Sequence, residues 1–338
     1  MKHDALRGLA AAFALAATAA VAPRPAAAVE LELAYLPILP MAQLLVMEGE
    51  GWTKAAGLDL KLTRFSSGPA EVQALASGKF DAAYVGIGPT VVARSKGIDL
   101  KVVASGCVNQ VALIARGDLA KSYGGVASPA AAFAAFHKAT GHPVKIATLP
   151  KGSTPDTVLR YWLEKTAKVA PADYEIVGMG EERVQQALLA GSVDAASILE
   201  PILTIVQKRD PGAKILVRGS DLFPNQPGAV VAVRERTIKA KADAVQKLVA
   251  LHIRATKFIK EHPDEAAKDI EKMIGAGLVA PDVMLAAVKS PMTQPVADPE
   301  IIVGATKALL AFQQSLGVTT KVDLDALFDP SFYKAATK

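Results

Sequence analysis

The sequence predicts an α/β protein with two lobes, in which each lobe is a mostly parallel sheet flanked by helices. The chain has 338 residues, enough for two globular units at roughly 100–200 residues each. Strand-like and helix-like segments alternate along it, which is typical of parallel sheets covered on both faces. The middle of the chain also repeats its beginning. With 51% hydrophobic and 21% charged residues, the composition supports a packed core and excludes extended disorder.

Residues 1–28 have the layout of a cleavable secretory signal. Lys2 and Arg7 make the start mildly basic, an apolar run follows over residues 9–21, and alanines end the segment. This order is typical of a signal peptide, and the run is shorter than the ~20 residues that span a bilayer. We therefore expect a periplasmic protein that begins near Val29. No cysteine lies near the cleavage site, so no lipid anchor is expected. A signal anchor or a buried N-terminal helix is the alternative.

The internal repeat is the strongest feature of the chain. Residues 32–37 match residues 145–150, and residues 73–83 match residues 186–196, both at an offset of 113. In the longer pair, QALASGKFDAA corresponds to QALLAGSVDAA. A constant offset over this span indicates two related units, one for each lobe. The alternative is chance similarity between alanine-rich segments.

Each copy predicts the order strand, helix, strand, helix, strand. In the first copy, strands are expected at residues 30–36, 60–65 and 82–85, and helices at 41–49 and 69–77. In the second copy, strands are expected at residues 144–149, 174–177 and 195–199, and helices at 154–168 and 182–190. Ser153 suits an N-cap with Pro155 in the first turn, whereas Gly78 and Gly191 suit left-handed helix ends.

The chain crosses twice between the lobes. We expect lobe one to hold residues 29–110 and 230–338, and lobe two to hold residues 111–229. Hinge crossovers are expected near residues 111–116 and 225–231. The latter contains Pro227 and Gly228.

The C-terminal hundred residues read as mostly helical. Apolar side chains recur at helical spacing over residues 241–261 and 301–315, which indicates amphipathic helices. We expect these helices to pack against lobe one, and nothing in them suggests chemistry.

Six loops follow the predicted strands, and ligands of open α/β sheets bind beyond the carboxyl ends of strands. These loops are residues 36–41, 66–68, 86–90, 151–154, 178–181 and 199–201. Most of them precede a helix, whose N-terminal N–H groups and positive dipole end favour anions. Hydroxyl groups in several of the loops can donate hydrogen bonds to ligand oxygens.

The candidate ligand contacts are therefore polar, glycine and apolar residues of these loops and of the first crossover. They are Leu39, Pro40, Ser66, Ser67, Gly68, Gly88, Thr90, Asn109, Lys151, Ser153, Thr154, Glu181 and Glu200. Each has a structural alternative. Serines and threonines before helices are often only caps, and glycines often only form turns. Lys151 either pairs with an anion or faces solvent, and Glu200 either faces solvent or contacts a cationic or N–H group of a ligand.

Several segments carry a resemblance to a known family. YLPILPMAQ, FSSGPAEVQALASGKFDAAYVGIGP, IATLPKGST and QALLAGSVDAASILEP resemble the nitrate/sulfonate/taurine family of periplasmic substrate-binding proteins of ABC importers. That family also includes binders of thiamine-pyrimidine precursors. The resemblance implies a type II binding fold that closes on one small anionic or zwitterionic ligand and then docks on an inner-membrane permease. It assigns cleft contacts to Ser66, Ser67, Gly68, Gly88, Ser153, Thr154 and Glu200. A heteroaromatic ligand, or a sensor subunit in place of a transport protein, stays open.

Other function classes lack their residues. The histidines beyond the predicted signal are scattered, Cys107 is the single cysteine, and no GxSxG motif is present. We therefore expect no catalytic residues, no metal site and no cofactor. No basic block interleaved with aromatic residues appears, so nucleic acid is not expected as a partner. A monomer is expected.

Overall fold

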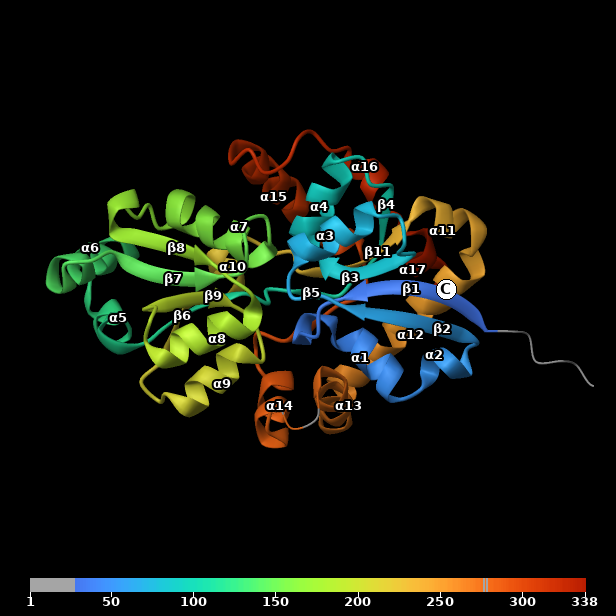
Figure 1. Ribbon diagram of the computed structural model, residues 1–338, viewed down its shortest axis with the longest axis horizontal. Helices are drawn as coiled ribbons and strands as arrows, with labels where there is room; N and C mark the ends of the chain where they lie inside the picture. The colour runs from blue at the N-terminus through green and yellow to red at the C-terminus, as the bar shows by residue number, and fades with distance from the viewer. Residues whose placement is uncertain (1–27, 276, 278) are drawn as a thin grey trace, which may run out of the picture.

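The computed structural model describes residues 28–275, 277 and 279–338, and the predicted signal peptide lies almost wholly outside the described residues. Two five-stranded sheets stand side by side, each with helices on both faces (Figure 1). One sheet has the strand order β2-β1-β3-β11-β4 and the other β10-β6-β9-β7-β8, and a two-stranded sheet pairs β12 with β5. The strands in the described part of the chain are β1 (Val29–Tyr35), β2 (Leu58–Arg64), β3 (Ala82–Gly86), β4 (Leu100–Ser105), β5 (Cys107–Val108), β6 (Ala112–Ala115), β7 (Val144–Thr148), β8 (Tyr174–Gly178), β9 (Ala195–Ile198), β10 (Lys214–Val217), β11 (Ala229–Arg234) and β12 (Gln294–Pro295).

The helices surround these sheets. Those in the described residues are α1 (Ala42–Gly49), α2 (Trp52–Ala55), α3 (Gly68–Ala76), α4 (Ile87–Ser95), α5 (Gly117–Ser122), α6 (Pro129–Thr140), α7 (Thr154–Tyr161), α8 (Glu181–Ala190), α9 (Ile202–Arg209), α10 (Gly219–Leu222), α11 (Glu235–Ala240), α12 (Ala242–Glu261), α13 (Pro263–Gly275), α14 (Pro281–Val288), α15 (Val303–Ser315), α16 (Leu324–Leu327) and α17 (Ser331–Ala336). Short helical turns are η1 (Leu39–Met41), η2 (Tyr123–Gly125), η3 (Trp162–Thr166), η4 (Pro171–Asp173) and η5 (Glu300–Ile302). Among the described residues, no helix has the length and apolar character to cross a membrane.

Both sheets are mostly parallel, which confirms the predicted fold class. In the first sheet β11 runs antiparallel to β3 and β4, while β1, β2 and β3 pair in parallel. In the second sheet β6 is antiparallel to β9 and β10, and β7 pairs in parallel with β8 and β9. The antiparallel strand of each sheet is the one that directly follows a crossing between the sheets. Residues 112–115 of the expected hinge are thus a buried strand within the second sheet.

The internal repeat is visible in three dimensions. Leu33 pairs with Ala82 between β1 and β3, and Ile146 pairs with Ala195 between β7 and β9. Both members of the second pair follow those of the first by 113 positions. The helices between these strands end as the sequence predicts, because Gly78 and Gly191 have φ of 78° and 73°.

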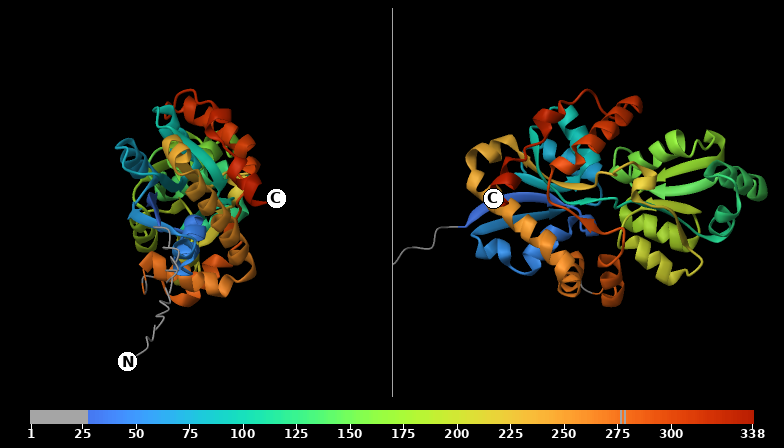
Figure 2. Two further views of the ribbon diagram at one scale, coloured as in Figure 1. Left: turned by 90° about the vertical axis from the view of Figure 1, so that its right-hand side faces the viewer. Right: turned by 180° about the vertical axis from the view of Figure 1, so that it is seen from behind.

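The C-terminal helices do more than cover the first lobe. α12 packs against α1, as expected, but α14 contacts α9 and α15 contacts both α4 and α7. The segment therefore touches both lobes, and the right-hand view of Figure 2 shows the red α15 and the orange α14 beside the junction, whereas α12 lies within lobe one. The helices pack against lobe one, as expected, and α14 and α15 add contacts to helices of lobe two that the sequence did not predict.

Candidate ligand-binding site

The two lobes meet at the N-termini of α4 and α7. β3 ends at Gly86 and leads directly into α4, so Gly88 lies in the first turn of that helix. Ser153 is the N-cap of α7, and Thr154 is its first residue. The Gly88 amide donates to Thr154 Oγ1 across the lobes at 3.4 Å. A Cβ atom on Gly86 would lie only 2.7 Å from the same hydroxyl, so this approach requires glycine. Two helix N-termini, one from each lobe, thus face each other.

A small inner cavity of about 20 Å³ lies beside this contact. Ser153, Thr154 and Gln110 contribute the polar side chains of its lining, which contains no charged side chain. The lining residues are Leu36, Ile38, Met41, Gly68, Gly86, Pro89, Gln110, Leu149, Ser153, Thr154, Pro155 and Leu199. Five of the six predicted loops contribute to it. Any ion bound here is held by backbone N–H groups, hydroxyls and the ends of helices.

The turn that precedes α7 is tightly held. Ser153 caps the helix, because its Oγ accepts from the Asp156 amide at 3.3 Å. Asp156 in turn accepts from the Gly152 amide at 3.1 Å and from Arg160 Nε at 2.8 Å. Gly152 has a φ of 88°, which favours glycine. These hydrogen bonds hold in place the turn that carries the hydroxyl groups of Ser153 and Thr154. The expected helix up to Lys168 ends sooner, since α7 continues through η3 only to Thr166.

The sixth loop lines a larger chamber at the mouth of the cleft. This mouth chamber has a volume of about 660 Å³ and is lined by Pro37, Arg64, Phe65, Ser66, Gly180, Glu181, Glu182 and Arg183. Arg64 Nη2 lies 3.6 Å from Glu182 Oε1 across the lobes, and its Nη1 donates to the Ile274 carbonyl at 3.3 Å. The loops that follow β1 and β2 line both the inner cavity and the chamber, so the two spaces share walls.

Glu181 is the titratable group that the cleft perturbs most clearly. Burial raises the pKa of its carboxyl to about 8, although the nearby Arg64 lowers it. Glu182 adds a second carboxylate that also raises this pKa. A carboxyl in this state is largely protonated at neutral pH and can donate a hydrogen bond.

Glu200 lies in a third, very small cavity of about 10 Å³, together with Leu39 and Pro40. Its two carboxylate oxygens accept from the Thr204 amide and hydroxyl, both at 3.0 Å. Burial is the main cause of its raised pKa, and hydrogen bonds from Ser290 and Thr204 oppose it. The sequence left two roles open for the Glu200 carboxylate, exposure to solvent and contact with a ligand. In the structure both of its oxygens already accept hydrogen bonds from Thr204 in the first turn of α9.

The remaining candidates are dispersed. Ser67 caps α3 through the Ala70 amide at 3.4 Å, and the Thr90 hydroxyl donates to the Gly86 carbonyl at 2.9 Å. Lys151 is exposed and is not in the lining of the three cavities. Asn109 lies in the crossover with a φ of 54° and donates to Gln294 Oε1 at 3.2 Å. Ser66 and Glu181 line the mouth chamber, while Gly68, Ser153 and Thr154 line the inner cavity.

Two polar residues at the junction were missed by the sequence analysis: Arg64 and Gln313. Gln313 belongs to α15, for which no chemical role was expected, yet its Nε2 donates to Thr157 Oγ1 of lobe two at 3.2 Å. A glutamine on the apolar face of an amphipathic helix was the available signal. Across the described residues, no group of three or more His, Cys, Asp or Glu side chains is arranged to hold a metal ion.

Comparison with known proteins agrees with this architecture. A Bacillus subtilis (strain 168) protein named "Putative aliphatic sulfonates-binding protein" is 28% identical over 307 residues, which cover 88% of this chain and 85% of the relative. The alkanesulfonate-binding protein SsuA from Xanthomonas axonopodis pv. citri, solved with bound MOPS, superposes with a TM-score of 0.71 at 18% identity, covering 90% of this chain and 99% of that one. The periplasmic nitrate-binding protein NrtA from Synechocystis PCC 6803 gives 0.77 at 14% identity, covering 92% and 88%.

These structural likenesses establish the type II binding fold. The family follows from the sequence itself, because the model of the NMT1-like family matches residues 24–275. The chain belongs to the NMT1-like family.

Proposed function

We propose that this protein is the solute-binding component of an ABC importer and captures a small anionic or zwitterionic solute between its lobes. The single observation that carries the proposal is the meeting of the α4 and α7 N-termini at Gly88 and Thr154. The relatives named above are binding proteins for sulfonates and nitrate, which supports the same class of solute. Catalysis has no part in the proposal.

Electrostatics favour an anion at this contact. Each helix N-terminus carries roughly half a positive charge, so two of them in opposition repel each other. An oxyanion between them would relieve this repulsion and accept from Gly88 N–H and from the hydroxyls of Ser153 and Thr154. The loop after β2 adds two further candidates, because Gly68 lines the inner cavity and Ser66 lines the mouth chamber.

Capture would work by hinge closure, in which the ligand favours the closed state because it touches both lobes. We assign lobe one to residues 29–110 and 230–338 and lobe two to residues 111–229. Gln226 ties the two crossovers together, since its Oε1 accepts from the Val111 amide at 2.8 Å. Asn109 and Asn225 beside it have φ of 54° and 49°. We therefore place the bending at the borders of the expected segments 111–116 and 225–231, around these two asparagines, because residues 112–115 and 229–231 are strands of the two sheets.

The cellular location, oligomeric state and partner that we propose follow from the role as a solute-binding component. A solute-binding component of this kind acts in the periplasm, is exported by a cleavable signal, works as a monomer, and hands its ligand to a permease in the inner membrane. The lining of the inner cavity includes no aromatic ring, which favours an aliphatic oxyanion over a heteroaromatic thiamine precursor. A sensor subunit would use the same cleft, and association with a permease distinguishes the two roles.

Calorimetry on the chain from Val29 onward tests the proposal. The panel is ethanesulfonate, taurine, nitrate and an aminopyrimidine. We expect binding of at least one oxyanion, and Thr154→Val should weaken it tenfold or more without lowering the melting temperature of the free protein. Ser192→Ala is the control, because Ser192 is an exposed hydroxyl of lobe two. Binding of the aminopyrimidine alone, or wild-type affinity in Thr154→Val, would contradict the proposal.

A further inference from the structure

Gln313 lies where the C-terminal segment meets both lobes. Its helix α15 packs against α4 of lobe one and α7 of lobe two. The side chain is completely buried, and its Nε2 donates to Thr157 Oγ1 at 3.2 Å. A buried amide at this position has both a donor and an acceptor to satisfy.

The hydrogen bonds of Thr157 fix the orientation of this amide. The Thr157 hydroxyl donates its proton to the Ser153 carbonyl at 2.9 Å, so its oxygen is left to accept. The amide nitrogen of Gln313 must therefore face Thr157, and Oε1 must point elsewhere. Oε1 is buried and has no hydrogen-bond partner among the described residues. An unpaired buried acceptor is unfavourable, so Gln313 holds an unused acceptor where α15 meets α4 and α7.

The same amide stands beside the proposed anion site. A Cβ atom on Gly88 would lie 3.3 Å from Gln313 Nε2 and 3.3 Å from Thr154 Oγ1. A ligand group that replaces the direct Gly88–Thr154 contact thus comes against Gln313 as well. The nitrogen has a second N–H beyond the one used by Thr157.

We propose that Gln313 is a specificity-determining ligand contact, in which Nε2 donates to the anionic head of the solute and Oε1 accepts from a hydroxyl or amino group beside that head. This inference rests on the proposed function and deepens it. The solute class is an organic anion with a hydrogen-bond donor near its charged end. Plain alkyl anions leave Oε1 unpaired, and a site built to pair a donor discriminates strongly against analogues that lack it.

Two sulfonates of equal charge and nearly equal size test this reading. Ethanesulfonate has no donor, whereas 2-hydroxyethanesulfonate carries one hydroxyl. Calorimetry should show that the wild-type chain from Val29 onward binds the hydroxylated compound at least fivefold more tightly. In Gln313→Met, which keeps the length of the side chain, the two affinities should agree within twofold. Gln313→Glu should weaken both at least tenfold, because it places a carboxylate beside the sulfonate.

Gln314→Met is the matched control, because this neighbouring amide is exposed and donates to the Thr320 carbonyl instead. It should keep the wild-type affinity ratio. A purely structural role for Gln313 predicts equal weakening of both sulfonates in Gln313→Met, with the ratio unchanged, and this result would overturn the inference. A wild-type ratio near one would also overturn it while leaving the proposed function intact. Failure of the wild type to bind either sulfonate or any other oxyanion would instead contradict the proposed function.

Discussion

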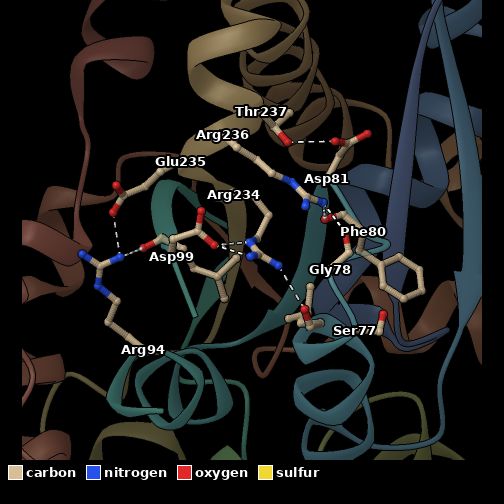
Figure 3. A network of polar contacts seen from close by, with 12 residues as sticks. Ser77, Gly78, Phe80, Asp81, Arg94, Asp99, Arg234, Glu235, Arg236 and Thr237 are labelled. Carbon is tan, nitrogen blue, oxygen red and sulfur yellow. Dashed lines mark hydrogen bonds and ion pairs between the residues drawn. The ribbon is translucent and has the colours of Figure 1, made fainter. Parts of the chain in front are cut away.

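Arg116 and Arg234 make the same contacts in the two lobes. Arg234 Nη1 donates to the Leu75 carbonyl at 3.0 Å, and Arg116 Nη1 donates to the Leu188 carbonyl at 3.1 Å. Arg234 is the last residue of β11 and Arg116 directly follows β6, the two strands that come after the crossings between the lobes. Arg234 reaches the last turn of α3, and Arg116 reaches the last turn of α8. Figure 3 shows the arrangement around Arg234.

Aspartates complete the two networks. Arg234 pairs with Asp99, and Arg116 Nε lies 3.1 Å from Asp210 Oδ2. The backbone amides match too, because Arg234 N donates to the Asp81 carbonyl at 2.9 Å and Arg116 N donates to the Asp194 carbonyl at 3.0 Å. Each crossing strand is therefore anchored to its sheet and helix by one arginine at its end.

Loss of either arginine should destabilise its own lobe. Arg234→Met keeps the apolar stem but takes this donor away from the Leu75 carbonyl of α3 and from the Asp99 carboxylate. We expect a loss of about 2 kcal/mol in the free energy of unfolding, measured by urea titration, and a similar loss for Arg116→Met. Lys239→Met, on the exposed face of α11, is the control. Losses no larger than that of the control would show that the anchor has no energetic role.

The sequence repeat predicted half of this symmetry. Asp81 and Asp194 stand at the offset of 113, and both carboxylates accept from a backbone amide of the neighbouring strand, at 3.2 Å from Glu32 and at 2.8 Å from Lys145. The equivalence of the two arginines could not be predicted from the repeat, because each lies at the end of a strand that follows a crossing between the lobes. Their separation in the chain differs from the repeat offset, so only the fold brings them to equivalent places.

The residues of the candidate site were likewise predicted only in part from the sequence. The rule for strand ends predicted Ser153, Thr154 and Gly68 at the inner cavity, because parallel strands bring their carboxyl ends to one edge. Gln313 was missed because its position depends on how the C-terminal helix packs across both lobes, which no local pattern encodes. Glu200 was predicted as a ligand contact, but its carboxylate accepts from the Thr204 amide of α9. The sequence alone does not distinguish a residue that binds the start of a helix from one that binds a ligand.

Buried His252 should make the protein sensitive to acid. Its Nε2 lies 2.8 Å from the Ser105 carbonyl, which only accepts, so Nε2 carries the proton and Nδ1 accepts from the Tyr84 hydroxyl at 3.0 Å. Burial lowers the pKa of His252 from 6.5 to about 4. The unfolded chain therefore binds a proton at a higher pH than the folded chain does. Stability should fall as the pH drops from about 6.5 to about 4, by about 3 kcal/mol in total.

Urea unfolding between pH 7.5 and 5 measures this effect above the range where most carboxylates titrate. His252→Gln should be less stable than the wild type at pH 7.5 but should lose less on acidification. Parallel pH profiles for the two proteins would show that His252 does not carry the acid sensitivity.

Glu181 should make ligand affinity depend on pH. Burial raises its pKa to about 8 in this structure, whereas in the open state of the proposed closure the carboxyl is expected near its ordinary value of about 4.3. Closing then takes up a proton between these values. Affinity for ethanesulfonate should therefore rise as the pH falls from 8 toward 5, by up to about tenfold for each pH unit.

Two glutamine variants isolate this group. Glu181→Gln should flatten the pH profile of affinity, because a neutral amide stands there at every pH. Glu182→Gln is the matched control, since that carboxylate is exposed and pairs with Arg64; exposed pairs of this kind contribute about 0–1 kcal/mol. It should keep the slope. A flat wild-type profile, or an equal change of slope in both variants, would contradict the assignment to Glu181.

Gly86 offers the most direct test of closure. Its φ of −66° suits alanine, and within lobe one the new Cβ would lie 3.3 Å from Pro89 Cδ. Gly86→Ala should therefore change the stability of the free protein by no more than about 0.5 kcal/mol. The new Cβ would lie 2.7 Å from Thr154 Oγ1, closer than atoms in contact tolerate, and this clash exists only when the lobes meet. Affinity should therefore fall tenfold or more while the melting temperature of the free protein holds. Gly304→Ala is the control, because Gly304 is an exposed residue in the first turn of α15 and has no atom within 4 Å of an added Cβ. Its affinity should stay within twofold of the wild type. If Gly86→Ala and Gly304→Ala bind equally well, the lobes do not need to meet at Gly86 and Thr154 for capture.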